Sequence, residues 1–250
     1  MNYHPTKSKN SNSNFRDNTS NFSIELNAKK CVALNFPESN LNYEIMNNIL
    51  LLLESDAIEE IHPNVAILLL FKIGKSYTNK YESYTIKTKV MDKLIRSMYV
   101  LFDNKAIAFC CHGLRNLKDL EESTLTLILV LTEKISESHA LLTGSQISLA
   151  CSGLCNLSGD TEEIQGLLEQ LAYKIDQSDA VMSSNEISNA CYGIQNLSGA
   201  GIYGEKLIAA LTEKIKSANN ALKSELKFNS NDISKCCYAL KSLKDNNIGK

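Results

Sequence analysis

Cysteine has the widest chemical range of any side chain in this sequence, because a thiol can act as a nucleophile, bind a metal or form a disulfide. The 250-residue chain contains eight: Cys31, Cys110, Cys111, Cys151, Cys155, Cys191, Cys236 and Cys237. Zinc is disfavoured, since there is no C-x-x-C pair and no H-x₃₋₅-H spacing. All eight lie in apolar, helix-like stretches of a chain long enough to build a core without crosslinks. We therefore expect free thiols in a reducing compartment, with neither zinc nor disulfides.

The sequence carries no sign of a catalytic centre. Its four histidines are scattered, and no carboxylate recurs at a fixed spacing from them. The glycine-rich phosphate-binding loops, the G-x-S-x-G nucleophile turn and the H-E-x-x-H zinc motif are absent from the sequence. We therefore expect no catalytic residue, no metal and no cofactor, and a binding protein rather than an enzyme.

The cysteines instead mark an internal repeat. Four segments align without gaps: NKAIAFCCHGLRNLKD (104–119), GSQISLACSGLCNLSG (144–159), SNEISNACYGIQNLSG (184–199) and SNDISKCCYALKSLKD (230–245). Their offsets are 40, 40 and 46 residues. A second motif recurs between them 40 residues apart, as LTEKI (131–135), LAYKI (171–175) and LTEKI (211–215). Weaker similarity at the same offset extends upstream to Cys31, so the sequence predicts five to six units of roughly 40 residues.

Each unit has the pattern of two helices. In the first, apolar residues recur with the period of one helix face, at Ile107, Cys110, Cys111, Leu114 and Leu117. Two of these helices begin with the spacing of a capping box, Thr143 with Gln146 and Ser183 with Glu186. We expect them to end at Ser158-Gly159 and Ser198-Gly199, where glycine can adopt the left-handed cap conformation. Asp160-Thr161-Glu162-Glu163 then opens the second helix with negative charge.

The predicted fold class is all-α, an α-solenoid of about five to six two-helix repeats. We expect a disordered polar tail over residues 1–22, which is rich in Asn, Ser and Lys, degenerate N-terminal repeats over 23–102, and clear repeats over 103–250. The tail is read as a solubilising arm, with a targeting or secretion segment as the alternative. The longest apolar runs, Ile49–Leu53 and Val65–Phe71, are too short to span a bilayer, and the N-terminus has no signal-peptide core. A cytoplasmic protein is expected, in a bacterium, an organelle or a host cell.

Two sets of recurring residues have a packing interpretation. Cys111, Cys151, Cys191 and Cys237 occupy one position in four successive helices, each followed two residues later by glycine or alanine. A thiol beside a glycine allows close approach of neighbouring helices, so we interpret these cysteines as packing residues. Asn116, Asn156 and Asn196 recur near the helix end, where we expect side-chain-to-backbone bonds to fix the turn.

Two other sets are candidate ligand-binding residues. At 100° per residue, one stripe of the first helix combines a small residue (Ala108, Ser148, Ser188, Ser234) with two variable positions, and it is predicted to be exposed. The variable candidates are His112, Arg115, Ser152, Tyr192, Gln195, Tyr238 and Lys241. Lys134, Lys174 and Lys214 recur 40 residues apart on the second helix, as a phosphate-binding ladder or as an ordinary salt-bridged face. The stripe likewise has two readings, as a modular recognition surface or as solvent-facing positions that vary freely.

The segment SQISLACSGLCNLSG and its relatives resemble the octotricopeptide repeat, and the related heptatricopeptide repeats are similar as well. The likeness covers residues 60–250. The tryptophan-containing core of that family is replaced here by Cys-Ser-Gly-Leu or Cys-Tyr-Gly-Ile, and the proline- and tryptophan-containing opening of its second helix is missing. The resemblance implies an α-solenoid that binds single-stranded RNA through variable side chains of the first helix. No nuclease-like segment follows the last repeat, so cleavage is not implied.

Two functions are therefore expected. The first is sequence-selective binding of single-stranded RNA, favoured by the resemblance and the stripe. The alternative is a protein–protein interaction scaffold, such as a secreted effector of an intracellular bacterium. The near-neutral charge, with 26 basic and 28 acidic residues, favours this alternative. Neither function involves a membrane or a small-molecule substrate.

Overall fold

The computed structural model describes residues 88–93, 95–96, 102–117, 121–197, 199–222 and 227–245, without the side chains of residues 116, 221–222 and 240–245. The predicted tail over 1–22 and most of the predicted degenerate repeats over 23–102, with Cys31, lie outside these residues.

All regular structure in the described ranges is helical, and no strand occurs there. The cysteine-containing segments form α4 (Asn104–Gly113), α6 (Gly144–Gly153), α8 (Ser184–Gly193) and α10 (Ser230–Asp245). The segments between them form α5 (Glu122–Glu137), α7 (Glu162–Asp176) and α9 (Gly201–Leu222). A 3₁₀ turn, η3 (Leu114–Asn116), follows α4, and residues 88–93 and 95–96 are also helical. The predicted all-α class is confirmed for this part of the chain.

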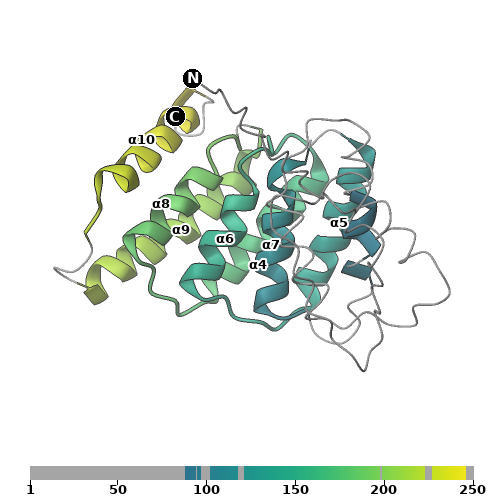
Figure 1. Ribbon diagram of the computed structural model, residues 1–250, viewed down its shortest axis with the longest axis horizontal. Helices are drawn as coiled ribbons and strands as arrows, with labels where there is room; N and C mark the ends of the chain where they lie inside the picture. Colours follow the sequence, from purple (N-terminus) through teal and green to yellow (C-terminus); the bar gives the residue numbers. More distant parts are fainter. Residues whose placement is uncertain are drawn as a thin grey trace, which may run out of the picture.

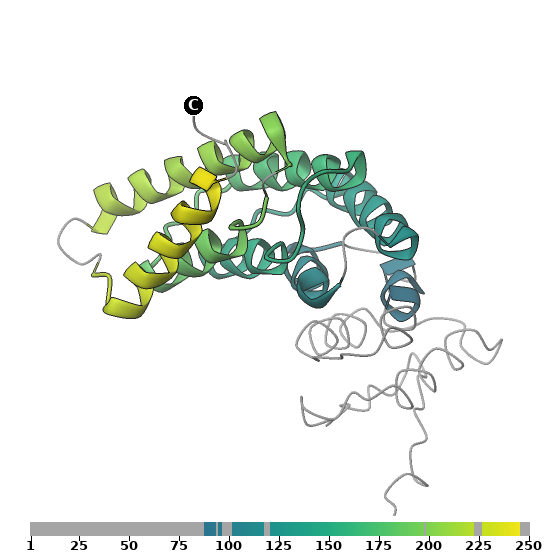
Figure 2. The ribbon, with the colours of Figure 1, turned by 90° about the horizontal axis from the view of Figure 1, so that it is seen from above.

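The helices form two layers. In the first layer, α4 packs on α6, α6 on α8 and α8 on α10, and in the second layer α5 packs on α7 and α7 on α9. Figure 1 shows that the helices of each layer follow one another across the molecule in chain order, and Figure 2 shows the two layers from above as a shallow arc. Each helix thus packs on the equivalent helix about 40 residues away, so the period of the sequence is also a period of contacts.

The predicted helix starts are confirmed. Thr143 and Ser183 each accept a bond from the backbone of the third helical residue, whose side chain accepts from the cap backbone in return. Thr161 caps α7, and two glutamates occupy its first turn, where negative charge stabilises the helix. A further reciprocal cap joins Asn229 and Asp232 at the start of α10. These local bonds define where the helices of both layers begin.

The predicted helix ends are wrong by about five residues. α6 and α8 end at Gly153 and Gly193, not at the Ser-Gly pairs, and Leu117 lies beyond α4 in extended backbone although it is buried. Gly159 does have a positive φ of 84°, but it turns the loop between α6 and α7 rather than capping α6. The chain leaves the helix early because its last turn tightens, with Leu154 N donating to Cys151 O at 3.0 Å.

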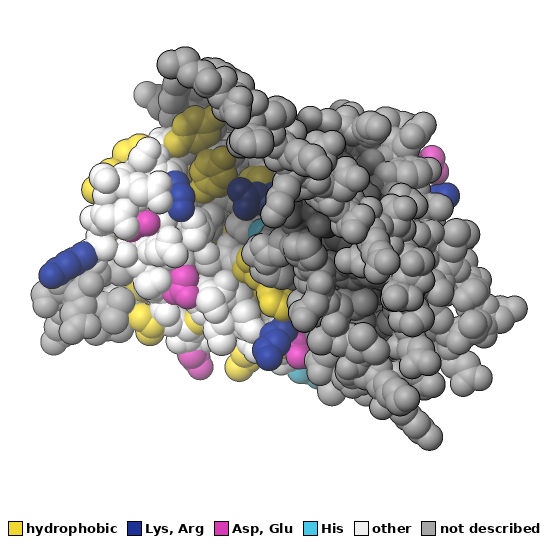
Figure 3. Space-filling model, viewed as in Figure 1, with side chains coloured by type: hydrophobic (Ala, Val, Ile, Leu, Met, Phe, Trp, Pro, Cys, Tyr) yellow, Lys and Arg dark blue, Asp and Glu magenta, His cyan; other side chains and the backbone are white. Residues whose placement is uncertain are grey.

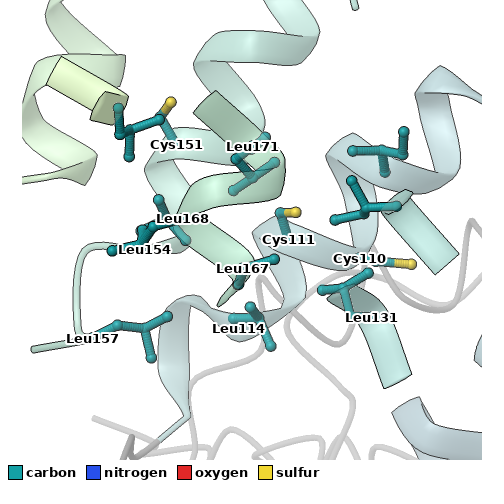
Figure 4. Close-up of a cluster of buried hydrophobic side chains, with 14 of the residues drawn as sticks. Cys110, Cys111, Leu114, Leu131, Cys151, Leu154, Leu157, Leu167, Leu168 and Leu171 are labelled. Carbon is teal, nitrogen blue, oxygen red and sulfur yellow. The ribbon is translucent and has the colours of Figure 1, made fainter. Parts of the chain in front are cut away.

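The core lies between the two layers and runs along the described molecule. It consists of first-layer residues such as Ile107, Ile147 and Ile187, and of second-layer leucines and isoleucines. Figure 4 shows how Cys111 and Cys151 lie among leucines of α7 and of the segment that follows α6, including Leu171 and Leu154. The apolar face predicted for each helix is therefore the face that meets the other layer.

Candidate binding surfaces

The contact between successive first-layer helices depends on glycine. A Cβ atom added to Gly153 would overlap the carbonyl oxygen of Cys111, and one added to Gly193 would overlap that of Cys151. In both places the obstacle is backbone, which cannot rotate away as a side chain can. The interpretation that these glycines allow close helix approach is therefore confirmed.

The cysteines beside these glycines are packing residues. Cys110, Cys111, Cys151 and Cys155 are buried, and the described cysteines are all free thiols. Burial raises the pKa of the Cys151 thiol to about 12, and it raises the pKa of Cys191 to about 12 as well. A thiol that keeps its proton at neutral pH is a poor nucleophile and a poor metal ligand. The burial supports the interpretation made from the sequence.

The recurring asparagines tie each repeat to the one before it. The side-chain nitrogen of Asn156 donates to the carbonyl oxygen of Arg115, and that of Asn196 donates to the carbonyl oxygen of Cys155. The predicted side-chain-to-backbone bonds thus exist, but they cross between repeats instead of closing the local turn.

The stripe predicted to be exposed on the first-layer helices is largely buried. Ala108, Ser148, Ser188, His112 and Gln195 are all buried, and among the described members of the stripe only Ser234 and Tyr238, on α10, are exposed. The helical-wheel argument fails because it considers one helix at a time. The neighbouring first-layer helix approaches so closely across the glycines that it covers the flank that the wheel assigns to solvent.

The stripe residues nevertheless meet one another across the repeats. His112 Nδ1 lies 3.2 Å from Ser152 Oγ, and the rings of Tyr192 and Tyr238 lie 6.2 Å apart, tilted by 31°. Arg115 is half-buried, and the Oε1 atom of Gln195 has no hydrogen-bond partner among the described residues. Lys241 lies on α10, but its side chain is outside the described part. Among the described members, Arg115, Ser152 and Tyr192 are partly exposed, and Tyr238 is exposed.

Two members of the lysine ladder bind the protein's own backbone. Lys174 Nζ donates to the carbonyl oxygen of Ser138, just beyond α5, and Lys214 Nζ donates to that of Ser178, just beyond α7. Lys174 is buried, which lowers its pKa, whereas Lys134 makes a solvent-exposed ion pair with Glu137 at 3.6 Å. These ammonium groups bind carbonyls at helix C-termini, where the helix dipole favours a cation. The recurrence of Ser138 and Ser178, each 36 residues before a lysine, is the sequence signal for this arrangement.

A groove between α7 and α9 was missed by the sequence reasoning. It encloses about 400 Å³ and is lined by Glu169, Ala172, Tyr173, Asp176, Lys206, Ala209, Ala210 and Glu213. The Tyr173 side chain is 57% exposed. Lys206 crosses the groove to pair with Glu169 at 2.6 Å, and its ammonium group also lies 5.3 Å from the Tyr203 ring. The groove thus combines a floor of small apolar residues, a mainly acidic rim and the largely exposed ring of Tyr173, whose centroid lies 5.9 Å from Lys174 Nζ.

Within the described ranges, no group of three His, Cys, Asp or Glu side chains is arranged to bind a metal ion. None of the helices described is both long and apolar enough to cross a membrane.

The chain was also compared with known proteins. It matches no protein-family model, no curated protein and no solved structure.

Proposed function

We propose that the chain is a non-enzymatic α-solenoid of five to six two-helix repeats that serves as a protein-binding scaffold. The groove between α7 and α9 is the observation that carries this proposal. Grooves between helices that combine an apolar floor with a few polar groups are common sites for peptide segments. The stacking of equivalent helices about 40 residues apart supports the solenoid part of the proposal.

The charge of the second layer favours a basic partner segment. The three second-layer helices, α5, α7 and α9, carry nine acidic residues and five lysines. All five lysines are engaged within the chain: Lys134, Lys206 and Lys216 pair with glutamates, and Lys174 and Lys214 donate to backbone carbonyls. Asp176 on the rim suits a lysine or arginine, whereas Glu213 already pairs with Lys216 at 2.7 Å. The Tyr173 ring suits the aliphatic stem or the cation itself.

Titration with two labelled peptides of equal length tests this proposal. One alternates lysine with leucine, and the other has glutamate at each lysine position. We expect saturable binding of the lysine peptide only, weakened about tenfold by Tyr173→Ser or Asp176→Asn and by raised salt. Glu122→Gln, on α5 and away from the groove, is the matched control. Equal binding of both peptides, or no effect of the groove variants, contradicts the proposal.

Single-stranded RNA binding remains the second candidate, and one observation favours it. The Tyr192–Tyr238 ring pair joins α8 to α10 with Tyr238 57% exposed, so a planar base has a ring on which to stack. The resemblance to octotricopeptide repeats supports the same ligand.

Binding of a labelled polyuridine strand at low salt tests this candidate. We expect Tyr192→Ala and Tyr238→Ala each to cost about 1–3 kcal/mol of binding free energy. Replacing Lys241 should reduce the salt slope by about one unit. A double tyrosine variant with full affinity contradicts RNA stacking at this pair. Pull-down from lysate with and without ribonuclease then separates the two candidate functions.

A further inference from the structure

Repeat positions that are buried in the earlier repeats are exposed to solvent at the α9–α10 end of the molecule. Ile107, Ile147 and Ile187 occupy one position in α4, α6 and α8, and their exposed fractions are 0%, 0% and 2%. The equivalent residue of α10 is Ile233, which is 51% exposed. Cys237 is likewise exposed, whereas its equivalents Cys111 and Cys151 are buried. The face that α4, α6 and α8 turn towards the core is therefore open on α10.

Helix α9 is open at matching positions. Its Ile208 and Ile215 correspond to Leu168 and Ile175 of α7, both of which are fully buried. Ile208 and Ile215 are only partly buried. The two helices therefore leave apolar residues of both layers uncovered at one end, and Figure 3 shows hydrophobic side chains on the molecular face near α10.

The earlier repeats show which element covers these positions. Each second-layer helix packs on the preceding one, α7 on α5 and α9 on α7. On the preceding helix, the positions equivalent to those that α9 leaves open are buried. Among the described residues, no helix follows α9 in its layer. The uncovered positions of α9 and α10 together thus have the arrangement that receives a second-layer helix elsewhere in the molecule.

We propose that this end binds an amphipathic helix of a partner protein, seated against α9 and α10 as α9 itself is seated against α7. The pattern shared by α5, α7 and α9 describes the partner's apolar face. Each carries a leucine followed by isoleucine or leucine, then a further leucine and an isoleucine at four-residue intervals, as in Leu167, Leu168, Leu171 and Ile175. A helix of about four turns with this stripe continues an interface that the molecule already uses twice.

A second copy of the chain is a poorer occupant. The apolar stripes of α5 and α7 have the pattern required of the partner helix, but they are fully buried in the chain's own core, as at Leu131 and Leu171. A second copy would have to unfold part of its second layer to supply such a helix, whereas a partner with a free amphipathic helix would not.

The test uses the full chain and a labelled peptide with the α7 sequence, residues 161–177, held helical by a lactam bridge on its polar face. We expect saturable binding that weakens at least tenfold in Ile233→Ser and in Ile208→Ser. The matched control is Ile202→Ser on α9, because Ile202 is 61% exposed and corresponds to the exposed Glu162 of α7. The same peptide with serine at Leu171 and Ile175 should not bind. Circular dichroism of each variant confirms that its fold is retained.

Two results would overturn this proposal. One is the absence of saturable binding by the helical peptide, or binding that Ile233→Ser leaves unchanged. The other is a concentration-dependent dimer, seen by sedimentation, that Ile233→Ser abolishes, since this would assign the face to a second copy. Tyr173→Ser should leave binding of the helical peptide intact. The proposal for the α9–α10 face and the proposal for the α7–α9 groove are therefore tested separately.

Discussion

The contact between α6 and α8 and the contact between α8 and α10 join equivalent helices in different ways. Between α6 and α8, Gly193 brings two backbones together and leaves no room for a side chain. Between α8 and α10, the position of that glycine is Ala239, and side chains make the contact instead. Ser188 donates to Asp232 at 2.9 Å, Lys235 donates to Asn189 at 2.7 Å, and Tyr192 lies against Tyr238. The central contact is thus made by backbone, and the terminal one by polar and aromatic side chains.

Helix α9, which precedes α10 in the chain, is also longer than its equivalent α7. The helix has 22 residues, whereas α7 has 15, and this accounts for the offset of 46 residues before α10 in place of 40. A contact made by side chains tolerates such a change in connection, because its groups can adjust over several rotatable bonds. A backbone contact through glycine has no such freedom. We infer that the glycine sets the close spacing of the central helices and that α10 is joined less tightly.

The largest expected effect comes from adding one methyl group to the central contact. Gly153→Ala should lower the free energy of unfolding by at least about 3 kcal/mol, because the new Cβ atom meets the Cys111 backbone and the two helices must separate. Chemical denaturation measures this change.

Two control variants sharpen the comparison. A Cβ atom at Gly166 of α7 would meet only Thr132 Cγ2 at 3.7 Å, so Gly166→Ala should stabilise the protein by about 0.5–1 kcal/mol. Ala239→Gly should cost about 1–2 kcal/mol, because it loses helix propensity and one buried methyl group. Equal effects of Gly153→Ala and Gly166→Ala would show that the central helices are not held by a backbone contact.

A smaller effect is expected from the lysine ladder. Lys174→Met keeps the apolar stem but leaves the Ser138 carbonyl oxygen without its ammonium donor, which should cost about 1–3 kcal/mol of stability. Lys134→Met removes only an exposed ion pair and should change stability by less than about 0.5 kcal/mol. Similar small losses for both variants would contradict the structural role of Lys174.

The repeat, the helices and their caps could be predicted from the sequence because each depends on residues close together in the chain. The 40-residue period, the capping box at Thr143 and the packing role of Gly153 follow from local spacing and side-chain size. The helix end at Gly153 could not be predicted in this way. It is accompanied by a bond from Asn156 to a carbonyl of the preceding repeat, and a local reading of the sequence does not show that contact.

The candidate site was predicted less well, and for the same reason. A helical wheel places His112 and Gln195 away from their own core, but their exposure depends on how closely the next helix stacks. The sequence offers two interpretations of Lys174, a phosphate ligand or part of a salt-bridged face, and neither includes its acceptor. That acceptor, the Ser138 carbonyl oxygen, is a backbone group that no sequence pattern displays directly. The α7–α9 groove is formed by two helices whose relation is known only once they are packed.

The buried thiols should make the central contact sensitive to alkali. Cys151 has a pKa raised to about 12 by burial, so the native state keeps this proton after the unfolded chain has lost it. Unfolding then releases a proton, and stability falls as pH rises from about 9 towards 12, by about 1.4 kcal/mol per pH unit for each such thiol. Below pH 9 the thiol is protonated in both states and contributes no pH dependence.

Cys151→Ala separates this effect from other titrations. At pH 7.5 the variant should be less stable than the unmodified protein by about 1–2 kcal/mol, because the lost sulfur leaves a small cavity. Between pH 9 and 10 this penalty should shrink by about 1 kcal/mol, since the alanine variant no longer carries the thiol whose ionisation favours unfolding. Ile147→Val, a truncation of a non-titrating core residue, should give a penalty that is constant over the same range. A Cys151→Ala penalty that is equally constant would mean that the thiol ionises freely in the folded protein, and the close, dry packing of α6 between α4 and α8 would then be wrong.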